Sequence, residues 1–253
     1  MTEQAEYPGN CAGSPTGRIS VIIPALNEEA SIAGVVGEMP WPLLRECIVV
    51  DNGSTDNTAA QARAAGAGVV WEPRRGYGQA CATGAASAVS SSDVLVFLDG
   101  DGSDVPAEIA LLAAPVLAGA YDFVIASRLR GAREPGSLLV SQVFAGWLAG
   151  MAMRLLYGVR YTDMGPMRAI TRSALERMRM QEMTYGWNLE MQMKAASAGL
   201  RILEVPTTCR CRRGGVSKVA GSLQGSVKAA YRITEVLLRI ALTGGRSQVP
   251  PAR

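Results

Sequence analysis

The 253-residue sequence contains no histidine, and this absence limits the chemistry open to the chain. Without an imidazole, Ser-His-Asp and Cys-His catalysis are excluded, and so are the usual histidine-ligated zinc sites. The five cysteines are an odd number without CxxC spacing, which is typical of a reduced, cytosolic protein rather than one held by disulfides. We expect Cys209-Arg-Cys211 to lie in a strand, without a metal or redox role.

Long apolar runs are also absent from the sequence. No stretch of about 20 uncharged apolar residues occurs, so we expect no transmembrane span. Residues 1–17 include Glu3 and Glu6 but no apolar segment, which predicts a disordered lead and not a signal peptide.

Acidic residues are scarce in the C-terminal quarter of the chain. Residues 201–253 hold ten Lys and Arg against two Asp and Glu, whereas residues 1–200 hold 15 against 20. Such a basic segment indicates phosphate, an anionic lipid surface or nucleic acid as a partner. After residue 200 only Tyr231 is aromatic, so stacking platforms for bases are lacking and we expect no nucleic-acid partner.

The most informative stretch runs from Val94 to Pro106. An apolar strand ends in Asp99-Gly100-Asp101-Gly102-Ser103-Asp104, at the strand end where open α/β sheets bind ligands. Asp99 and Asp101 flank a glycine, so both carboxylates can converge on a hard cation such as Mg²⁺ or Mn²⁺. The alternative is an acidic turn in which Asp104 caps the helix beginning at Pro106, and both interpretations can hold together.

Strands and helices alternate along most of the chain. This alternation predicts one α/β domain with a mostly parallel central sheet and right-handed crossovers. The expected strands cover residues 19–24, 47–51, 68–71, 94–98, 122–126, 166–170 and 200–205. The expected helices cover residues 57–65, 79–89, 106–117 and 185–198, and another is expected to open at Asn27-Glu28-Glu29 with its acids in the first turn.

Two further helices are predicted outside this alternation. Between residues 140 and 156, large apolar residues recur at helical spacing with few charges, which fits either a core helix or a helix resting on a membrane interface. The helix expected over 223–242 is basic along one face, which suits an interfacial helix or a plain docking helix.

Polar clusters follow the first two strands, where carboxylates and amides can hydrogen-bond a base and a ribose. They are Pro24, Leu26, Asn27 and Glu28 after the first strand, and Asp51, Gly53 and Ser54 after the second. Arg75 and the glycines beside it add charge and flexible backbone. The chain has neither a Walker sequence nor GxGxxG, so a P-loop NTPase or an NAD enzyme fits poorly.

Taken together, these motifs resemble those of family-2 glycosyltransferases of the GT-A fold. The resemblance covers about residues 18–220, and the remaining 221–253 form the predicted amphipathic helix and tail. Asp163–Arg168 and Arg213–Lys218 are similar to the polyprenyl-phosphate, dolichyl-phosphate mannose synthase-like branch. The motifs that carry the resemblance to the superfamily are Ile23-Pro24…Asn27-Glu28, Val49–Asp56, Asp99-Gly-Asp101 and Ser127-Arg128.

The resemblance implies a nucleotide-sugar donor, Mg²⁺ or Mn²⁺, inversion at the anomeric carbon and a lipid-phosphate acceptor. It implies that Glu28 and Asp51 contact the nucleoside, with Gly100 also in the donor site. Asp99 would lie near ribose and metal, Asp101 would bind the metal, and Ser103 stands where the family often has a glutamine that assists it. The cations implied for the donor diphosphate are Arg213 and Lys218.

Two acceptors remain open. An acceptor phosphate is already anionic and needs cations, for which Arg128, Arg133 and Arg168 are candidates. A hydroxyl acceptor needs a carboxylate base, for which Asp163 is the candidate. A nucleotidyltransferase is a third possibility, because it also combines an α/β sheet with acidic metal ligands. If the acceptor is a lipid phosphate, we expect a cytoplasmic protein that is peripheral at the inner face of the membrane.

Overall fold

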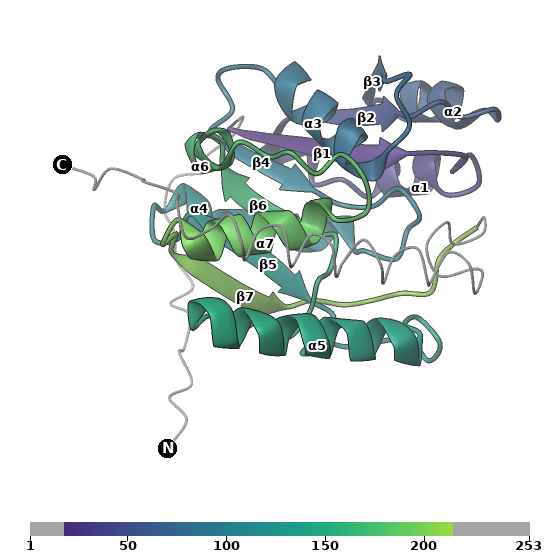
Figure 1. Cartoon of the computed structure of the whole chain (residues 1–253). Helices are drawn as coiled ribbons and strands as arrows, with labels where there is room; N and C mark the ends of the chain where they lie inside the picture. The colour runs from purple at the N-terminus through teal and green to yellow at the C-terminus, as the bar shows by residue number, and fades with distance from the viewer. Residues whose placement is uncertain (1–17, 215–253) are drawn as a thin grey trace.

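The computed structural model describes residues 18–214. The predicted lead, Lys218 and the helix expected over 223–242 lie outside the described residues. A seven-stranded sheet forms the centre of the domain, in the order β3-β2-β1-β4-β6-β5-β7 (Figure 1). The strands are β1 Ile19–Ala25, β2 Leu44–Asp51, β3 Gly68–Trp71, β4 Val94–Phe97, β5 Phe123–Ser127, β6 Arg168–Thr171 and β7 Ile202–Pro206.

The sheet is mostly parallel, as the alternation of strands and helices predicts. Only β6 runs against its neighbours, pairing antiparallel with both β4 and β5 among the described strands. The helices are α1 Ile32–Gly37, α2 Thr58–Ala64, α3 Tyr77–Ser87, α4 Ile109–Leu117, α5 Val140–Tyr157, α6 Arg172–Met178 and α7 Trp187–Ser197, with short 3₁₀ turns at Trp41–Leu43 and Pro106–Glu108. None of the helices within residues 18–214 is long and apolar enough to cross a bilayer.

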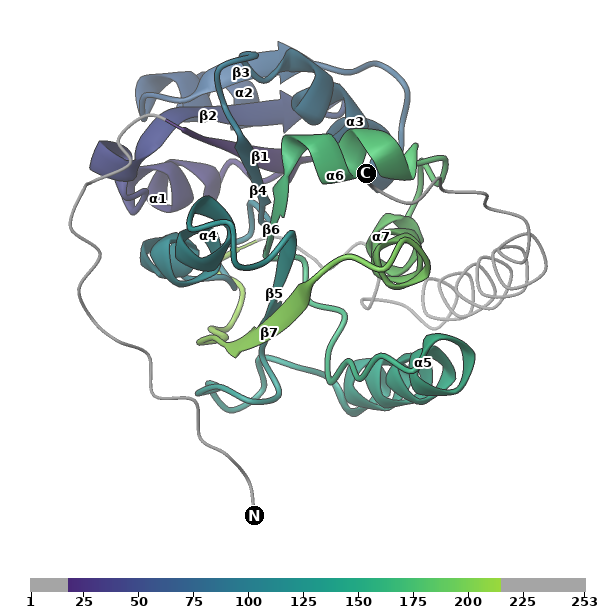
Figure 2. The ribbon, with the colours of Figure 1, turned by 90° about the vertical axis from the view of Figure 1, so that its left-hand side faces the viewer.

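Helices cover both faces of the sheet (Figure 2). Between the helices and the sheet lie two hydrophobic cores. Successive strand residues point to opposite faces, so Val21 and Ile23 enter the core beneath α1, α2 and α4. Ile22, between them, enters the other core with residues of α3, α5, α6 and α7. Because the central strands are buried on both faces, they read as continuous apolar runs in the sequence.

Two local expectations are wrong. Asn27-Glu28-Glu29 does not open a helix: Asn27 has a left-handed φ of 51° and α1 begins only at Ile32. Asp104 does not cap the turn at Pro106, whose N-cap is Val105. Instead Asp104 is buried and its Oδ2 accepts the Asp99 N–H at 3.3 Å, because the loop after β4 folds back on itself.

Candidate active site

A cavity of about 710 Å³ opens at the carboxyl ends of the strands, within the size range of small-molecule sites. Its walls come from the loops after β1, β2, β4 and β5, the start of α3, the start of α5 and the segment after β7. The predicted site residues that line it are Pro24, Leu26, Glu28, Arg75, Asp99, Gly100, Asp101, Ser103 and Arg128. The sequence motifs therefore converge on one site.

Acidic side chains crowd the loop after β4. Burial, followed by the charges of Asp101 and Asp104, raises the pKa of Asp99 to about 8. Burial also raises the pKa of Asp104 to about 7. The phenol of Tyr77 donates to Asp99 Oδ1 at 3.1 Å and fixes its carboxylate at the cavity wall. Such crowding of carboxylates is relieved when a cation binds among them.

Asp101 is held from both sides. Its Oδ1 accepts the Ser103 N–H at 2.8 Å, and its Oδ2 lies 2.9 Å from Arg212 Nη2. Arg212 Nη1 also donates to Glu28, at 3.0 Å from Oε1. A guanidinium thus lies between the carboxylates at the cavity wall.

The donor set suits a hard divalent cation. Within residues 18–214, no group of three or more His, Cys, Asp and Glu side chains is arranged to hold a metal alone. Mg²⁺ typically binds one or two carboxylates and takes its other ligands from water and substrate phosphates. Asp101 fits that pattern, because its Oδ2 already faces the Arg212 guanidinium. Asp99 is separated from it by one glycine. Ser103 contributes its N–H to Asp101 and its side chain lies at the cavity wall.

Hydrogen bonds between polar residues connect the loops after β1 and β2. The Asn27 N–H donates to Ser54 Oγ at 3.0 Å, and Asn27 Oδ1 accepts the Thr55 N–H at 2.8 Å. Asp51 Oδ1 accepts the Ser54 N–H at 2.8 Å, which shapes the turn at Gly53, where φ is 83°. Four predicted site residues therefore support the cavity wall without lining the cavity: Asn27, Asp51, Gly53 and Ser54.

Arg128 and Asp163 form a buried ion pair at the end of β5. Arg128 Nε and Nη2 each lie 2.8 Å from an Asp163 oxygen, and the Arg128 N–H donates to the same carboxylate at 3.0 Å. Burial alone would raise the pKa of Asp163, but the hydrogen bonds and charge of Arg128 lower it below its ordinary value. Arg128 lines the cavity, whereas Asp163 lies beyond it.

With this geometry established, comparisons with known proteins identify the family. Residues 20–179, more than half of the chain, match Glycosyl transferase family 2. The chain belongs to this family. It is an enzyme, a hexosyltransferase.

Relatives of known sequence cover most of this glycosyltransferase. An uncharacterized glycosyltransferase of Mycobacterium tuberculosis is 35% identical over 87% of this chain and 97% of its own length. Undecaprenyl-phosphate mannosyltransferase of Micrococcus luteus is 32% identical over 92% of this chain and 99% of its own. These relatives confirm the predicted resemblance to family-2 glycosyltransferases.

A solved structure confirms the fold predicted for the family. The crystal structure of glucosyl-3-phosphoglycerate synthase from Mycobacterium tuberculosis with phosphoglyceric acid superimposes with a TM-score of 0.73 and 27% identity. The match covers 92% of this chain and 85% of that chain. Another structure of the same synthase holds Mn²⁺ and UDP-glucose.

Three predicted cations of this glycosyltransferase, all within the described residues, do not line the cavity. Arg168 is fully buried and donates to the backbone carbonyls of Gly165, Pro166 and Asn188, so it occupies the interior rather than the wall expected of a phosphate ligand. Arg213 pairs with Glu38 at 2.6 Å. Arg133 is exposed beside the cavity, in a bridge with Cys209.

Several residues at the cavity wall were not predicted from the sequence. Arg212 is the most informative of them, because it contacts two predicted ligands. The signal was the basic run Arg210-Cys-Arg-Arg213, which does not reveal which guanidinium enters the site. The other unpredicted lining residues include Leu138, Leu139, Gln142 and Tyr185.

Proposed function

We propose that the protein transfers a hexose, with inversion, from a nucleotide-diphosphate sugar of the GDP-mannose or UDP-glucose type to a polyprenyl phosphate, using Mg²⁺ or Mn²⁺ at the cytoplasmic membrane face. The donor half of the proposal is supported by the acidic loop and the cavity at the carboxyl ends of the strands. The acceptor half is supported by one observation above all, the exposed apolar face of α5.

Most large apolar residues of α5 face outward, with Leu155 81% and Trp147 56% exposed, whereas Met153 enters the core. The small residues of α5 also face inward, and a Cβ on Gly150 would lie 2.3 Å from the Tyr161 carbonyl oxygen. The exposed apolar residues of α5 are Val140, Phe144, Trp147, Leu148, Met151, Leu155 and Leu156; we call them the α5 ridge.

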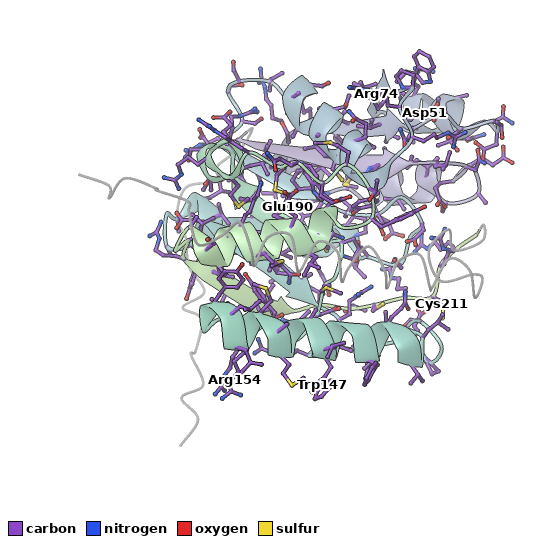
Figure 3. The ribbon with its side chains drawn as sticks, in the orientation of Figure 1. Asp51, Arg74, Trp147, Arg154, Glu190 and Cys211 are labelled. Atoms are coloured by element: carbon purple, nitrogen blue, oxygen red, sulfur yellow. The ribbon has the colours of Figure 1, made fainter. Side chains whose placement is uncertain are left out.

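Contiguous apolar surfaces of this kind mark protein or membrane contacts. Trp147 and Arg154 both project away from the body of the domain (Figure 3), as an aromatic residue and a snorkelling cation do at a lipid interface. Of the two interpretations of this helix, core or interface, the exposure favours the interface.

The α5 ridge lies next to residues that line the cavity. Leu138 and Leu139, just before α5, and Gln142, in its first turn, line the same cavity as Asp101 and Arg128. A lipid whose phosphate lies near Arg128 can therefore extend its chain toward the ridge. The M. luteus relative is named for an undecaprenyl-phosphate acceptor, which agrees with this arrangement.

The charges in the site suit an anionic acceptor. A phosphate is ionised near neutral pH and needs no general base, whereas a hydroxyl needs one. Asp163, the candidate base, is paired bidentately with Arg128, which lowers its pKa and makes it a weak proton acceptor. Arg128, at the cavity wall, and exposed Arg133 beside it supply cations for the acceptor.

Catalysis follows from charge development at the donor. Negative charge grows on the departing diphosphate while the anomeric carbon becomes electron-poor. A divalent cation held by Asp101, with Asp99 beside it, would neutralise the diphosphate charge as a Lewis acid. The hydrogen bond from Tyr77 fixes the Asp99 carboxylate. The hydrogen bonds between the loops after β1 and β2 keep rigid the part of the cavity that would bind the nucleoside.

A hydroxyl acceptor is the second candidate, since the superimposed synthase binds phosphoglyceric acid. Incubation with GDP-mannose and UDP-glucose, each with undecaprenyl phosphate or 3-phosphoglycerate, distinguishes the two acceptors. We expect a lipid product whose mass contains one hexose and one phosphate at the junction. A hexosyl phosphoglycerate with no lipid product would refute the proposed acceptor. A separate incubation with a nucleoside triphosphate and a hexose 1-phosphate tests for a nucleotidyltransferase, which would release pyrophosphate.

The α5 ridge yields its own prediction. Replacing Phe144, Trp147 and Leu155 together by Ser should weaken binding to anionic vesicles on the order of 100-fold or more, because three large apolar side chains no longer enter the interface. Co-sedimentation measures this change, and turnover of a water-soluble short-chain acceptor should be retained. Trp71→Ser is the matched control, since Trp71 is 67% exposed on the edge strand β3. Equal vesicle binding by the triple variant and wild type would rule out the ridge as the lipid contact.

A further inference from the structure

We propose that Arg212 is an internal counter-cation: it takes the place of the divalent cation at Asp101 in the free enzyme, where it bridges Asp101 to Glu28, and moves to the donor diphosphate when cation and donor bind together. This inference rests on the proposed metal-dependent use of a nucleotide donor. It assigns to Arg212 a role in coupling the two ligands.

The contacts of Arg212 carry the inference. Its Nη2 lies 2.9 Å from Asp101 Oδ2, and its Nη1 lies 3.0 and 3.2 Å from the two oxygens of Glu28. The side chains of Glu28 and Asp101 are only 7% and 10% exposed, so both carboxylates are largely removed from water. A cation is therefore needed there before any metal arrives, and the guanidinium supplies it.

The backbone of Arg212 is fixed beside the acidic loop while its side chain reaches into the cavity. On either side of it, the Arg210 N–H donates to the Ser103 carbonyl at 2.9 Å and the Arg213 N–H donates to the Asp101 carbonyl at 3.0 Å. Gly102 permits this close approach, since a Cβ there would lie 2.9 Å from Arg213 Cδ and its φ is 78°. A rotation of the Arg212 side chain is thus sufficient to free Asp101.

Charge balance makes the exchange depend on the donor. A divalent cation that binds without the donor must enter beside the Arg212 guanidinium. Either the two positive charges repel each other, or Arg212 moves away from Asp101 and Glu28 and gains no new partner. A diphosphate supplies that partner, because arginine binds phosphate oxygens bidentately. Cation and nucleotide therefore strengthen each other's binding, and thermodynamic linkage makes the effect reciprocal.

The test measures Mn²⁺ binding without any sugar transfer. Free Mn²⁺ is quantified by electron paramagnetic resonance for wild type and Arg212→Met, first alone and then with saturating GDP or UDP. We expect Arg212→Met to bind Mn²⁺ at least tenfold more tightly than wild type without nucleotide. In wild type, saturating nucleotide should increase the affinity for Mn²⁺, and we expect this increase to be at least tenfold smaller in the variant.

Arg210→Met is the matched control. Arg210 belongs to the same basic run but pairs with Glu38 at 2.8 Å, outside the cavity, so Mn²⁺ affinity should stay within twofold of wild type. If Arg212→Met does not fold, Arg212→Lys keeps a charge without the bidentate fork, and its Mn²⁺ affinity without nucleotide should still exceed that of wild type.

Equal Mn²⁺ affinity of wild type and folded Arg212 variants would overturn the counter-cation role. If neither protein binds Mn²⁺ with or without nucleotide, both this inference and the metal-dependent part of the proposed function fail. If the Mn²⁺ affinities behave as expected but no lipid product forms, only the proposed acceptor fails.

Discussion

Asp101→Asn should lower kcat by on the order of 10²–10³-fold or more while leaving the unfolding temperature close to that of wild type. The amide keeps an oxygen that accepts the Ser103 N–H, so the loop after β4 retains its shape. The substitution removes the negative charge that would hold the divalent cation at the departing diphosphate. Turnover is measured with the donor that gives product in the acceptor assay, across a Mn²⁺ titration.

The control for this variant is Asp93→Asn. Asp93 is an exposed carboxylate that pairs with Arg18, away from the residues that line the cavity, and its loss should leave kcat unchanged. Wild-type turnover by folded Asp101→Asn, at any Mn²⁺ concentration, would remove Asp101 from the proposed metal site.

The second large effect concerns stability. Arg128→Met should reduce the free energy of unfolding by about 3–5 kcal/mol, because it leaves Asp163 buried and unpaired. The double variant Arg128→Met/Asp163→Asn should recover most of this loss, since the amide is neutral and still accepts backbone N–H groups. Urea unfolding measures both variants. Activity should stay low in the double variant, because Arg128 lines the cavity.

Acid dependence gives a second measure of the same ion pair. The pKa of Asp163 is lowered in the folded protein, so the pair stabilises the fold above the unfolded value of about 3.9 and this contribution is lost as pH falls below it. Below about pH 4, wild type should therefore lose stability more steeply than the double variant. A double variant as unstable as Arg128→Met, with identical acid dependence, would show that Asp163 carries no unpaired charge in the single variant.

The backbone of the site was largely predictable from local patterns. Apolar strands that run directly into polar residues placed Glu28 and Asp101 at one edge of the sheet, because parallel strands end together. The family and the GT-A fold followed from the same motifs. The start of α1 was not predictable, because the left-handed turn at Asn27 depends on hydrogen bonds to Ser54 and Thr55 from the neighbouring loop.

Side-chain directions were harder to predict. Nothing in the sequence distinguishes Arg212 from Arg213, because the choice is set by which carboxylate each one meets after folding. Asp163 precedes β6, and in an all-parallel sheet it would lie at the edge away from the site. Because β6 runs antiparallel to β4 and β5, its N-terminal end lies at the same edge of the sheet as the site. Only the resemblance to the family pointed to Asp163.

The outward-facing residues of α5 also determine how the protein behaves once it is isolated. In plain buffer, without detergent or lipid, two copies can shield this surface by meeting each other. If the α5 ridge contacts lipid as proposed, a dimer or larger particle seen by size-exclusion chromatography under those conditions would arise from the uncovered ridge. Mild surfactant should then dissolve such particles without changing the fold.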